Sequence, residues 1–490
     1  MKSNHRVLFV IVLSLLFAVP ALAQTYRASI RGTIYDPNQA VISGATIQLT
    51  NIGTGETRTT TSDNNGDYGI SSLPPGVYQL EVVQPSFRKG SLKIELLVNQ
   101  QQRQDITLQI GSPELTTVDL TLEAELKKDT PSLGTVIENR HVTELPLDGR
   151  NFFELSLLVP GAVPPAQGSA GSARGDFSFS VNGAREDANN FLLDGVYNID
   201  PKLNTFGVRP SVDAIREFEM LTSTYDASFG RNPGAQINVI LNSGSNDVHG
   251  SVFGFHRNAA LDARNFFAPA GEGKPKYIRN QFGGAIGGPI VRNRTFFFAD
   301  YEGTRSREGI TRITNVPTAA EREGNFSQSL FGVPTNPFTG QPFDGGVIPS
   351  FFINPVGRAI AALYPLPNRD VPFQNFVSSP TQRDDNDSFD ARVDHRMNDK
   401  ADLTFRYSFG DRDLFEPFTG AAFSLVPGFG DTVKRRSQNG MGALTLVLTP
   451  NLVNETRIAF SRVAASVTQE ASVLNSQVGL PAISPRERDL

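Results

Sequence analysis

The chain has 490 residues, with 45 Lys and Arg against 50 Asp and Glu and a formal net charge of −5. This length allows two to four domains. The absence of cysteine excludes disulfide scaffolds and thiolate metal sites, and without a long Lys/Arg block nothing indicates nucleic-acid binding.

The first 23 residues have the pattern of a cleaved signal peptide. Lys2 and Arg6 give a positive start, Val7–Val19 is an apolar run, and Ala21–Ala23 is a small-residue cleavage site. The alternative is a membrane anchor, but the run falls short of the ~20 residues that span a bilayer. We expect export and a mature chain that begins at Gln24. No later stretch predicts a transmembrane helix, so membrane insertion would require a closed β-barrel.

Residues 24–111 predict a β-sandwich, because about seven short strands are separated by turn residues such as Asn65-Gly66. The run Ser62–Val82 resembles the carboxypeptidase regulatory-like domain. That fold is related to starch-binding sandwiches, so the resemblance leaves open both sugar binding and a role as a spacer or docking module. The expected strands are Ile30–Tyr35, Ala45–Asn51, Thr57–Thr61, Tyr68–Ile70, Val77–Val83, Leu92–Val98 and Gln104–Ile110.

The acidic residues Asp63 and Asp67 invite a calcium interpretation. An EF-hand loop needs Gly at its sixth position and Glu at its twelfth, whereas these positions hold Tyr68 and Pro74. We therefore expect a solvated turn.

The stretch Leu145–Asp200 predicts a small, loop-rich unit, because its short apolar runs are broken by Gly, Pro, Asn and Asp. Such a unit needs a larger wall to bury its apolar side. Further on, the spacing of Val212, Ile215 and Phe218 predicts a short helix over Ser211–Glu219. Gly234–Asn242 predicts a buried strand.

The second half of the chain predicts strands that alternate apolar and polar residues. Phe389 and Val393 fall on one face, and Asp390 and Arg392 on the other. An apolar outer face and a polar inner face are what an outer-membrane barrel requires. The expected strands are Gly250–Arg257, Arg279–Ile290, Thr295–Glu302, Ser388–Met397, Asp402–Gly410, Gly440–Thr449 and Val453–Arg462.

The connections suggest an orientation for these strands. Asn398–Lys400 is a short turn, as on a periplasmic side, and Gly303–Asn386 is long and Pro/Gly-rich, as in an extracellular loop. Seven strands cannot enclose a plug, since plugged barrels have about 22 strands. Because the chain also stops at Arg486–Leu490 and not in a strand that ends with Phe, we expect the N-terminal part of a longer protein with an aggregation-prone sheet edge.

Several linked motifs in the same order resemble TonB-dependent outer-membrane receptors of the Oar-like subgroup. The resemblance implies a plug domain inside a barrel and active uptake of a ligand that binds extracellular loops. The motifs are LPLDGRNFFEL, VNGAREDANNFLLDG, the run from Ser211 to Asn258, ALDARNFF and NQFGGAIGGPIVRNRTFFFADYEG.

The resemblance also implies an extended segment before the plug that pairs with TonB by strand addition, a mode that places few demands on sequence. An ordinary first plug strand is the alternative. The segment to which we assign this role is Thr116, Thr117, Val118, Asp119 and Leu120.

Four charged plug residues are candidates for holding the plug against the barrel wall until TonB pulls: Arg150, Arg185, Asp187 and Asp194. The alternative is ordinary turn polarity. If they are enclosed they should be paired, because an unpaired buried charge is costly.

An enzyme interpretation rests on His141 and Glu144, which have the H-x-x-E spacing of zinc carboxypeptidases, with His249 as a third ligand. Glu144 however opens the LPLDGRNFF motif, and the region lacks the alternating strand–helix pattern of an α/β catalytic core. We expect no catalytic residues, no metal and no cofactor.

Together these observations predict a mainly β protein: an N-terminal β-sandwich, a small α+β plug, and the first strands of a large antiparallel transmembrane β-barrel, which is incomplete. The expected function is TonB-dependent uptake across a Gram-negative outer membrane, with a periplasmic sandwich. The partners would be TonB, the membrane and an unknown small-molecule or oligosaccharide ligand, but no nucleic acid. Alternatives are an adhesion or structural barrel without transport, or a sugar-binding module. The expected domains are a signal peptide (residues 1–23), the carboxypeptidase regulatory-like sandwich (24–111), the plug (112–246) and the N-terminal part of the barrel (247–490).

Overall fold

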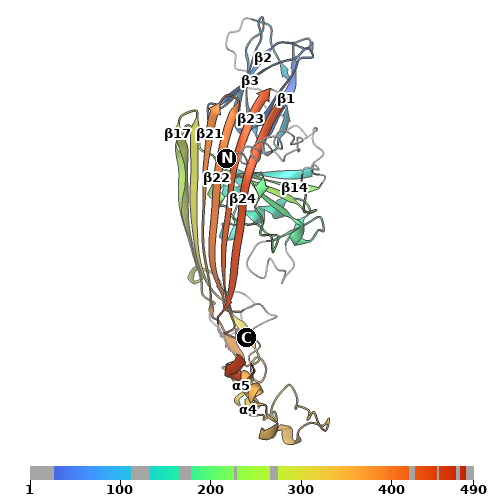
Figure 1. Cartoon of the computed structure of the whole chain (residues 1–490), viewed down its shortest axis with the longest axis vertical. Helices are drawn as coiled ribbons and strands as arrows, with labels where there is room; N and C mark the ends of the chain where they lie inside the picture. Colours follow the sequence, from blue (N-terminus) through green and yellow to red (C-terminus); the bar gives the residue numbers. More distant parts are fainter. Residues whose placement is uncertain are drawn as a thin grey trace, which may run out of the picture.

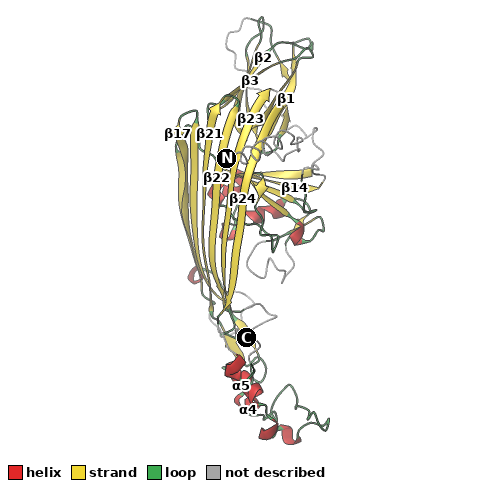
Figure 2. Cartoon of the chain, viewed as in Figure 1, coloured by secondary structure: helices red, strands yellow, loops and turns green. Residues whose placement is uncertain are grey.

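The chain forms three parts, which we call the sandwich, the plug and the wall. The sandwich lies at one end of the wall and the plug lies against one face of it (Figure 1). Strands dominate all three parts and the helices are short (Figure 2), as the predicted mainly β fold requires. The computed structural model describes residues 27–111, 133–164, 178–223, 225, 229–264, 274–418, 425–449, 452–470 and 475–481.

The predicted signal peptide lies outside the described residues. Among the residues that are described, no helix combines the length and the apolar composition that crossing a membrane requires.

The sandwich consists of two four-stranded sheets. Its strands are β1 (Ala28–Tyr35), β2 (Thr46–Asn51), β3 (Thr57–Thr61), β4 (Asp67–Leu73), β5 (Gly76–Val83), β6 (Gly90–Leu96), β7 (Gln101–Arg103) and β8 (Ile106–Thr107). One sheet has the order β4-β1-β7, with β8 also on β1, and the other has the order β3-β2-β5-β6. Alternation along β5 buries Tyr78, Leu80 and Val82 in the core between the sheets. The predicted sandwich is confirmed.

The acidic turn of the sandwich is a backbone cap. The Asp63 carboxylate accepts hydrogen bonds from the N–H groups of Asn65 at 2.8 Å and Asp67 at 3.0 Å. Gly66 adopts φ 75°, which glycine takes without strain. The exposed position of Asp63 agrees with the solvated turn that the sequence predicts.

The plug is built on a mixed five-stranded sheet with short helices over it. Its strands are β9 (Leu133–Glu138), β10 (Ala162–Val163), β11 (Ser180–Val181), β12 (Asn190–Leu193), β13 (Val196–Tyr197), β14 (Ile215–Ser223) and β15 (Gln236–Leu241). Its helices are α2 (Asn139–Glu144), η1 (Asp148–Arg150), η2 (Phe152–Leu158), η3 (Glu186–Ala188) and η4 (Val212–Ala214). The sheet order is β13-β12-β15-β14-β9, with β12 and β15 parallel. A separate pair is formed by β10 and β11.

The helix predicted over Ser211–Glu219 is wrong. Only the single turn η4 forms, and the chain then continues as β14. Both neighbours hydrogen-bond to this strand, β15 on one side and β9 on the other. Pairing on both edges therefore overrides the three-residue period of Val212, Ile215 and Phe218. The buried strand predicted over Gly234–Asn242 is present as β15.

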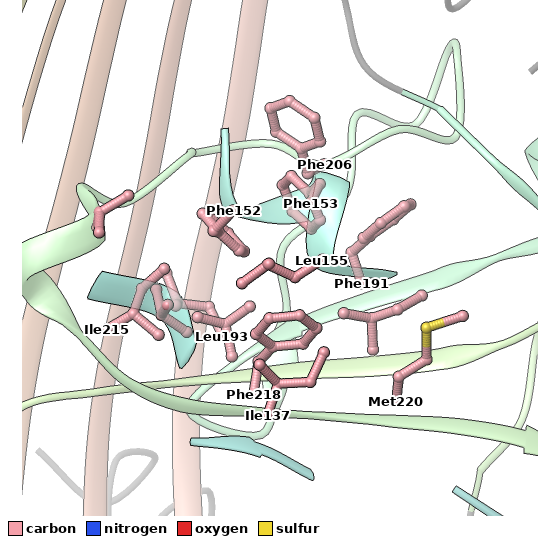
Figure 3. Close-up of a cluster of buried hydrophobic side chains, with 14 of the residues drawn as sticks. Ile137, Phe152, Phe153, Leu155, Phe191, Leu193, Phe206, Ile215, Phe218 and Met220 are labelled. Atoms are coloured by element: carbon pink, nitrogen blue, oxygen red, sulfur yellow. The ribbon is translucent and has the colours of Figure 1, made fainter. Parts of the chain in front are cut away.

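Aromatic side chains from loops and short helices fill the core of the plug (Figure 3). The Phe153 ring stacks on Phe206 with centroids 4.6 Å apart and meets Phe191 edge-on at 5.6 Å. Phe152 and Phe218 are fully buried beside them. The NFF sequence after η1 thus anchors the loop-rich stretch onto the sheet.

The wall is an antiparallel sheet whose seven strands follow one another in chain order. Each predicted strand is present, and each is longer than predicted. The strands are β16 (His249–Asn258), β17 (Tyr277–Val291), β18 (Thr295–Gly309), β21 (Thr381–Asn398), β22 (Ala401–Glu416), β23 (Asp431–Thr449) and β24 (Leu452–Gln469).

The parts of β18 and β21 that extend beyond the predicted bounds carry charged residues. Arg305 pairs with Asp387 at 2.8 Å and Arg307 with Asp385 at 2.6 Å between β18 and β21. These cross-strand pairs extend the ladder into stretches that sequence alone assigned to a loop. Opposite charges on facing strands support such pairing.

The two faces of the wall have opposite character. Along β22, the aromatic residues Phe405 and Tyr407 are exposed on one face, whereas Thr404, Arg406 and Ser408 are buried on the other. The predicted alternation of apolar outer and polar inner residues is confirmed, and the polar face is the one against the plug.

Beyond the end of the wall that is remote from the sandwich, a long connection carries small elements (Figure 1). A capping box between Thr318 and Glu321 starts its first helix. The elements of the remaining connections are η5 (Ala259–Leu261), β19 (Arg312–Thr314), α4 (Ala319–Arg322), η6 (Asp344–Gly346), η7 (Ser350–Phe352), α5 (Pro355–Leu363), β20 (Phe376–Ser378) and η8 (Asn475–Val478).

Candidate functional site

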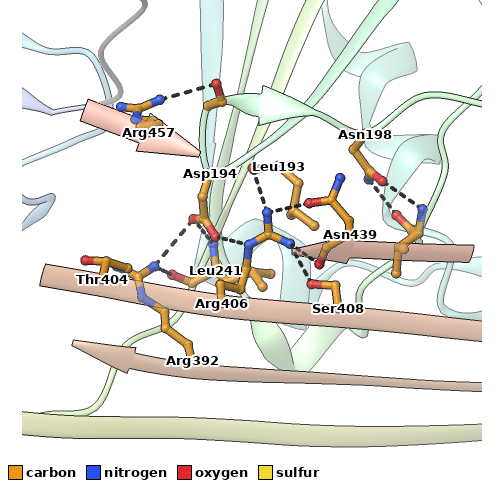
Figure 4. Close-up of polar contacts among 12 residues, drawn as sticks. Leu193, Asp194, Asn198, Leu241, Arg392, Thr404, Arg406, Ser408, Asn439 and Arg457 are labelled. Atoms are coloured by element: carbon orange, nitrogen blue, oxygen red, sulfur yellow. Dashed lines mark hydrogen bonds and ion pairs between the residues drawn. The ribbon is translucent and has the colours of Figure 1, made fainter. Parts of the chain in front are cut away.

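The candidate site is the contact between the plug and the polar face of the wall, and Asp194 lies at its centre. The sequence Leu193-Asp194-Gly195-Val196 connects β12 to β13. Asp194 and Gly195 both take positive φ, 49° and 75°, the geometry that an Asp-Gly pair favours in a two-residue hairpin. The turn places the Asp194 side chain at the wall-facing end of the plug sheet (Figure 4).

Two wall arginines enclose the Asp194 carboxylate. Its Oδ2 lies 3.0 Å from Nε of Arg406, and its Oδ1 lies 3.4 Å from Nη1 of Arg392. The N–H of Leu241 donates to Oδ1 at 3.1 Å. The Asp194 and Arg406 side chains are both 0% exposed. This is a fully buried ion pair between two parts of the protein that are far apart in sequence.

Arg406 uses the rest of its guanidinium to tie the same turn to the neighbouring strands. Nη2 donates to the Leu193 carbonyl at 3.2 Å and to Oδ1 of Asn439 at 2.6 Å, and Nη1 donates to Oγ of Ser408 at 2.8 Å (Figure 4). The Asn439 amide donates in turn to the Tyr197 carbonyl at 2.8 Å. Removing one member of such a network leaves a buried charge unpaired, which costs about 3–5 kcal/mol.

Arg150 forms a second fastening between the plug and the wall. It comes from η1, where the DGR turn takes positive φ at Gly149 and Arg150. Its guanidinium pairs with Asp213 of the plug and, at 3.2 Å, with Glu302 of the wall. The Phe253 ring lies under the guanidinium, 4.0 Å from centroid to Cζ, a distance typical of a cation–π contact.

The other two predicted residues do not reach the wall. Arg185 and Asp187 pair with each other at 2.8 Å, and their side chains are 85% and 44% exposed. Neither residue contacts the seven described wall strands, so their role in holding the plug stays a prediction. Arg185 is the N-cap of η3, and Asp187 lies within it.

Sequence analysis also missed several residues of the contact. Asp148 pairs with Arg279 of the wall at 2.6 Å, and Arg435 donates to the Phe206 carbonyl at 2.7 Å. The wall partners Arg392, Arg406 and Glu302 stand at polar positions of the alternating strands. That alternation places them on the inner face, but the plug residue opposite each one follows only from the assembled structure.

The sandwich contacts the plug through a buried carboxylate. Oε1 of Glu217 accepts the N–H of Val98 at 3.0 Å. Burial raises the pKa of Glu217 to about 7, although the charge of Arg216 and the Val98 N–H both act to lower it. This contact therefore contains a group that changes charge near neutral pH.

The sandwich also contacts the wall. Nη2 of Arg58 lies 2.8 Å from Oδ2 of Asp402, and its Nη1 donates to the Asp399 carbonyl at 3.4 Å. The Asn246 N–H donates to the Gly53 carbonyl at 2.9 Å. The sandwich is thus docked at the end of the wall where the short turn between β21 and β22 lies.

The remaining predicted sites lie elsewhere. The proposed TonB-contact segment, Thr116 to Leu120, falls outside the described residues. Glu144 pairs with Arg140 at 2.9 Å on the exposed helix α2, which also carries His141. His249 contacts the Asp247 carbonyl at 3.0 Å. Within the part of the chain that the structure describes, no group of His, Cys, Asp and Glu side chains is arranged to hold a metal ion.

Comparison with known protein families assigns two parts of the chain. Residues 240–489 match the family described as outer membrane beta barrel domain, and residues 29–109 match the carboxypeptidase regulatory-like domain. A curated relative, the TonB-dependent transporter Oar of Myxococcus xanthus, is 25% identical over 351 residues. The match covers 64% of this chain and 30% of the relative, so the chain spans under a third of that protein's length.

Solved structures give more distant matches. The outer membrane transporter YddB from Escherichia coli has a TM-score of 0.45 at 13% identity, with 70% of this chain and 40% of that chain covered. The siderophore receptor PirA from Acinetobacter baumannii has a TM-score of 0.37 at 13% identity, with 71% and 46% covered. The expectation that the chain is not an enzyme agrees with its transporter relative.

Proposed function

The chain belongs to the outer membrane beta barrel domain family, and from that premise we propose that it acts as a TonB-dependent receptor that takes up a ligand across the outer membrane. The observation that carries the proposal is the plug on the polar face of the wall, fastened there by the buried pair of Asp194 and Arg406. A barrel that serves only as an anchor has no need of such a domain. The similarity to the transporter Oar supports the same conclusion.

The fastening suits a contact that opens under force. When the plug moves, a buried ion pair separates, and water that enters the contact hydrates each of the two charged groups. The pair is therefore costly to break by deleting one partner and less costly to break by separating both into water. In the proposed mechanism, a pull from TonB draws the plug off the wall and opens a path for the ligand.

TonB would bind the segment Thr116 to Leu120 by strand addition. Support comes from the position of β9, which follows this segment in the chain and is the edge strand of the plug sheet. A pull applied before Leu133 would load the edge strand first and separate it from β14 one hydrogen bond at a time.

The proposed location is the outer membrane, reached after cleavage of the signal peptide formed by residues 1–23. The sandwich would lie in the periplasm, because its partner Asp402 stands beside the short turn that ends β21. The long connection with α4 and α5 would then face the exterior and contact the ligand.

The ligand that we propose is an oligosaccharide or another small molecule, on the basis of the sandwich that resembles carbohydrate-binding relatives. A second candidate function is adhesion or a structural role without transport. The exposed aromatic side chains Phe338 and Phe351 of the long connection favour it, since they also suit attachment to a surface.

One experiment distinguishes TonB-dependent uptake from adhesion. Cells that produce the protein are given a fluorescently labelled oligosaccharide mixture, with and without TonB and with and without a proton uncoupler. The uptake proposal predicts internal label that is lost without TonB, with the uncoupler, or on deletion of residues 116–120. Accumulation that is insensitive to TonB would refute it, and surface-bound label alone would favour adhesion.

A further inference from the structure

A cavity of about 790 Å³ lies where the sandwich, the plug and the wall meet. The sandwich lines it with the turn at Pro74 and Pro75, the plug with Arg216 and Leu241, and the wall with Thr404. Its volume falls within the roughly 300–1,000 Å³ of small-molecule sites. Its walls combine apolar surface with thirteen charged residues, seven basic and six acidic.

Arg216 is placed in this cavity by an irregularity in the plug sheet. Ile215 pairs with Leu241 and Glu217 with Ile240, so the register shifts at Arg216. On the other edge, pairing with β9 begins only at Glu217. A bulge of this kind re-aims the side chain that it carries.

The Arg216 guanidinium spans the gap to the sandwich. Its Nη2 atom would lie 3.4 Å from a Cβ atom added to Gly76, so it stands against the turn between β4 and β5. It therefore touches the sandwich without belonging to it, and it faces the cavity between the two domains.

Within the described ranges, Arg216 makes no hydrogen bond and no ion pair. Burial lowers the pKa of its guanidinium, and the charge of Arg392 acts in the same direction, while the charges of Glu217, Tyr78 and Glu95 act to raise it. Two cations thus stand close together, while the Arg392 charge is already engaged by Asp394 at 2.8 Å. The carboxylates of Glu217 and Glu95 act on Arg216 through their charge, but neither forms an ion pair with it. A desolvated cation without a directly bound counter-charge is costly, and an anion bound to Arg216 would reduce that cost.

Several other charged groups around the cavity have partners of their own, and the carboxylates of Glu95 and Glu138 line it as well. Arg27 lies 3.9 Å from Asp402, and Arg396 lies 2.8 Å from Asp399. The carboxylate nearest in sequence, Glu217, receives the Val98 N–H, and its pKa of about 7 leaves it partly neutral at neutral pH. Repulsion between Glu217 and an entering anion is therefore weakened.

We propose that the cavity binds a small organic anion, with its carboxylate or phosphate group on Arg216 and its apolar body against Pro74, Pro75 and Leu241. The inference does not rest on transport, because it follows from the charge and shape of the cavity. Because the sandwich, the plug and the wall all line the site, a bound anion would also tighten the junction between them.

The test uses the full chain in detergent and three probes of one length: hexanoate, hexyl phosphate and neutral hexanol. Titration calorimetry should detect one of the two anions but not hexanol. Binding of hexanoate alone assigns a carboxylate ligand, and binding of hexyl phosphate alone assigns a phosphate ligand. Arg216→Gln should weaken the anion by about tenfold or more, because a charged hydrogen bond is lost.

Arg140→Gln is the matched control, since Arg140 lies at the rim of the cavity, is exposed and pairs with Glu144. It should leave the affinity unchanged. Failure of both anions to bind, equal binding of hexanol, or equal affinity in Arg216→Gln would overturn the proposal.

A measurement on the unmodified protein guards against misfolding of the Arg216→Gln variant. Phenylglyoxal modifies accessible guanidinium groups, and mass spectrometry locates the adduct. The bound anion should slow modification of Arg216 severalfold and leave Arg140 unaffected. Equal rates at Arg216 with and without the anions would overturn the proposal independently of any substitution.

Discussion

The core of the sandwich and the contact between the plug and the wall bury their residues by opposite means. The sandwich core is aliphatic and aromatic, with Leu80 and Tyr78 each 1% exposed. The plug–wall contact is charged, with Asp194 and Arg406 fully enclosed. Apolar burial makes separation costly because water meets apolar surface on both sides. Charged burial makes loss of one partner costly, but separation into water restores hydration to both.

The two kinds of burial suit parts of the molecule that behave differently under load. We infer that the sandwich is a permanent unit and that the plug–wall contact is a fastening that can open. The predictions below test this contrast, beginning with the largest expected effect.

Arg406→Met should destabilise the plug most. It leaves the buried Asp194 carboxylate with only the longer contact to Arg392, at 3.4 Å, so the free energy of unfolding of the plug should fall by up to about 3–5 kcal/mol. Pulse proteolysis in urea, read on plug fragments, measures the change. Arg436→Met is the control, because Arg436 pairs with Asp411 on the exposed face of the wall.

The pair can also be removed as a whole. The double variant Asp194→Leu, Arg406→Met should recover most of the loss, because no charge is then left unpaired. A single Arg406→Met variant within about 1 kcal/mol of the wild type would show that the buried pair does not fasten the plug, since a lost buried pair costs more than that.

Leu80→Ala should destabilise the sandwich by about 2–5 kcal/mol, because it leaves a cavity in an aliphatic core. The urea midpoint of plug fragments should stay unchanged, as measured in the same experiment. A parallel loss in the plug would mean that the two regions unfold together, which contradicts the contrast between them.

The contact of the sandwich with the plug should weaken as pH rises. The pKa of Glu217 is raised from 4.5 to about 7 when docked, so its protonated form favours docking. The stabilisation is fully present below about pH 4.5 and is lost as pH rises to about 7, on the order of 1–3 kcal/mol. Urea midpoints of the sandwich at pH 5 and pH 8 measure it.

Two substitutions sharpen this prediction. Glu217→Gln should remove the pH dependence, because no proton is then exchanged at the contact. Glu144→Gln should keep it, since Glu144 is exposed and pairs with Arg140. A wild-type midpoint that rises between pH 5 and pH 8 would have the wrong sign for this account.

Arg150→Lys should cost the plug about 1–2 kcal/mol. Lysine keeps the charge but loses the planar fork that reaches Asp213 and Glu302 together, and its stacking over Phe253 is weaker. Pulse proteolysis of the plug again provides the measurement. An unchanged midpoint would mean that the charge alone matters here.

The smallest effect is expected at Arg185. Arg185→Ala removes an exposed pair with Asp187 and should change stability by no more than about 0.5 kcal/mol. Arg185 and Asp187 belong to the same sequence motif as Asp194. This variant therefore tests whether the effect on stability depends on where a residue lies in the structure or only on its membership of the motif. A loss comparable with that of Arg406→Met would contradict the structure.

Much of the fold follows from the sequence because its patterns are local. Alternation of residues such as Phe389 and Asp390 predicts the wall strands, and the period and turns of the first hundred residues predict the sandwich. The errors occur where pairing between distant segments determines the secondary structure. The segment predicted as a helix from Ser211 to Glu219 continues from Ile215 as the strand β14, because β9 and β15 both pair with that strand.

The site was predictable in part for the same reason. Asp194 and Arg150 stand out as charges inside apolar motifs, but Arg185 and Asp187 stand out equally and lie in solvent. Asp194 and Arg150 differ from the other two residues in having partners on the wall. These partners, Arg406 and Glu302, lie more than a hundred residues away in the chain. No local pattern could match these partners.

Single-molecule pulling can show whether the plug–wall contact opens before the wall unfolds. A handle is attached at residue 118, the wall is held in a lipid bilayer, and the order of detachment is recorded. The account predicts that the plug separates from the wall while β16 to β24 stay folded, and that replacing Asp194 and Arg406 by Leu and Met raises the force required. Unfolding of the wall strands before the plug detaches, or a lower force in the apolar double variant, would contradict it.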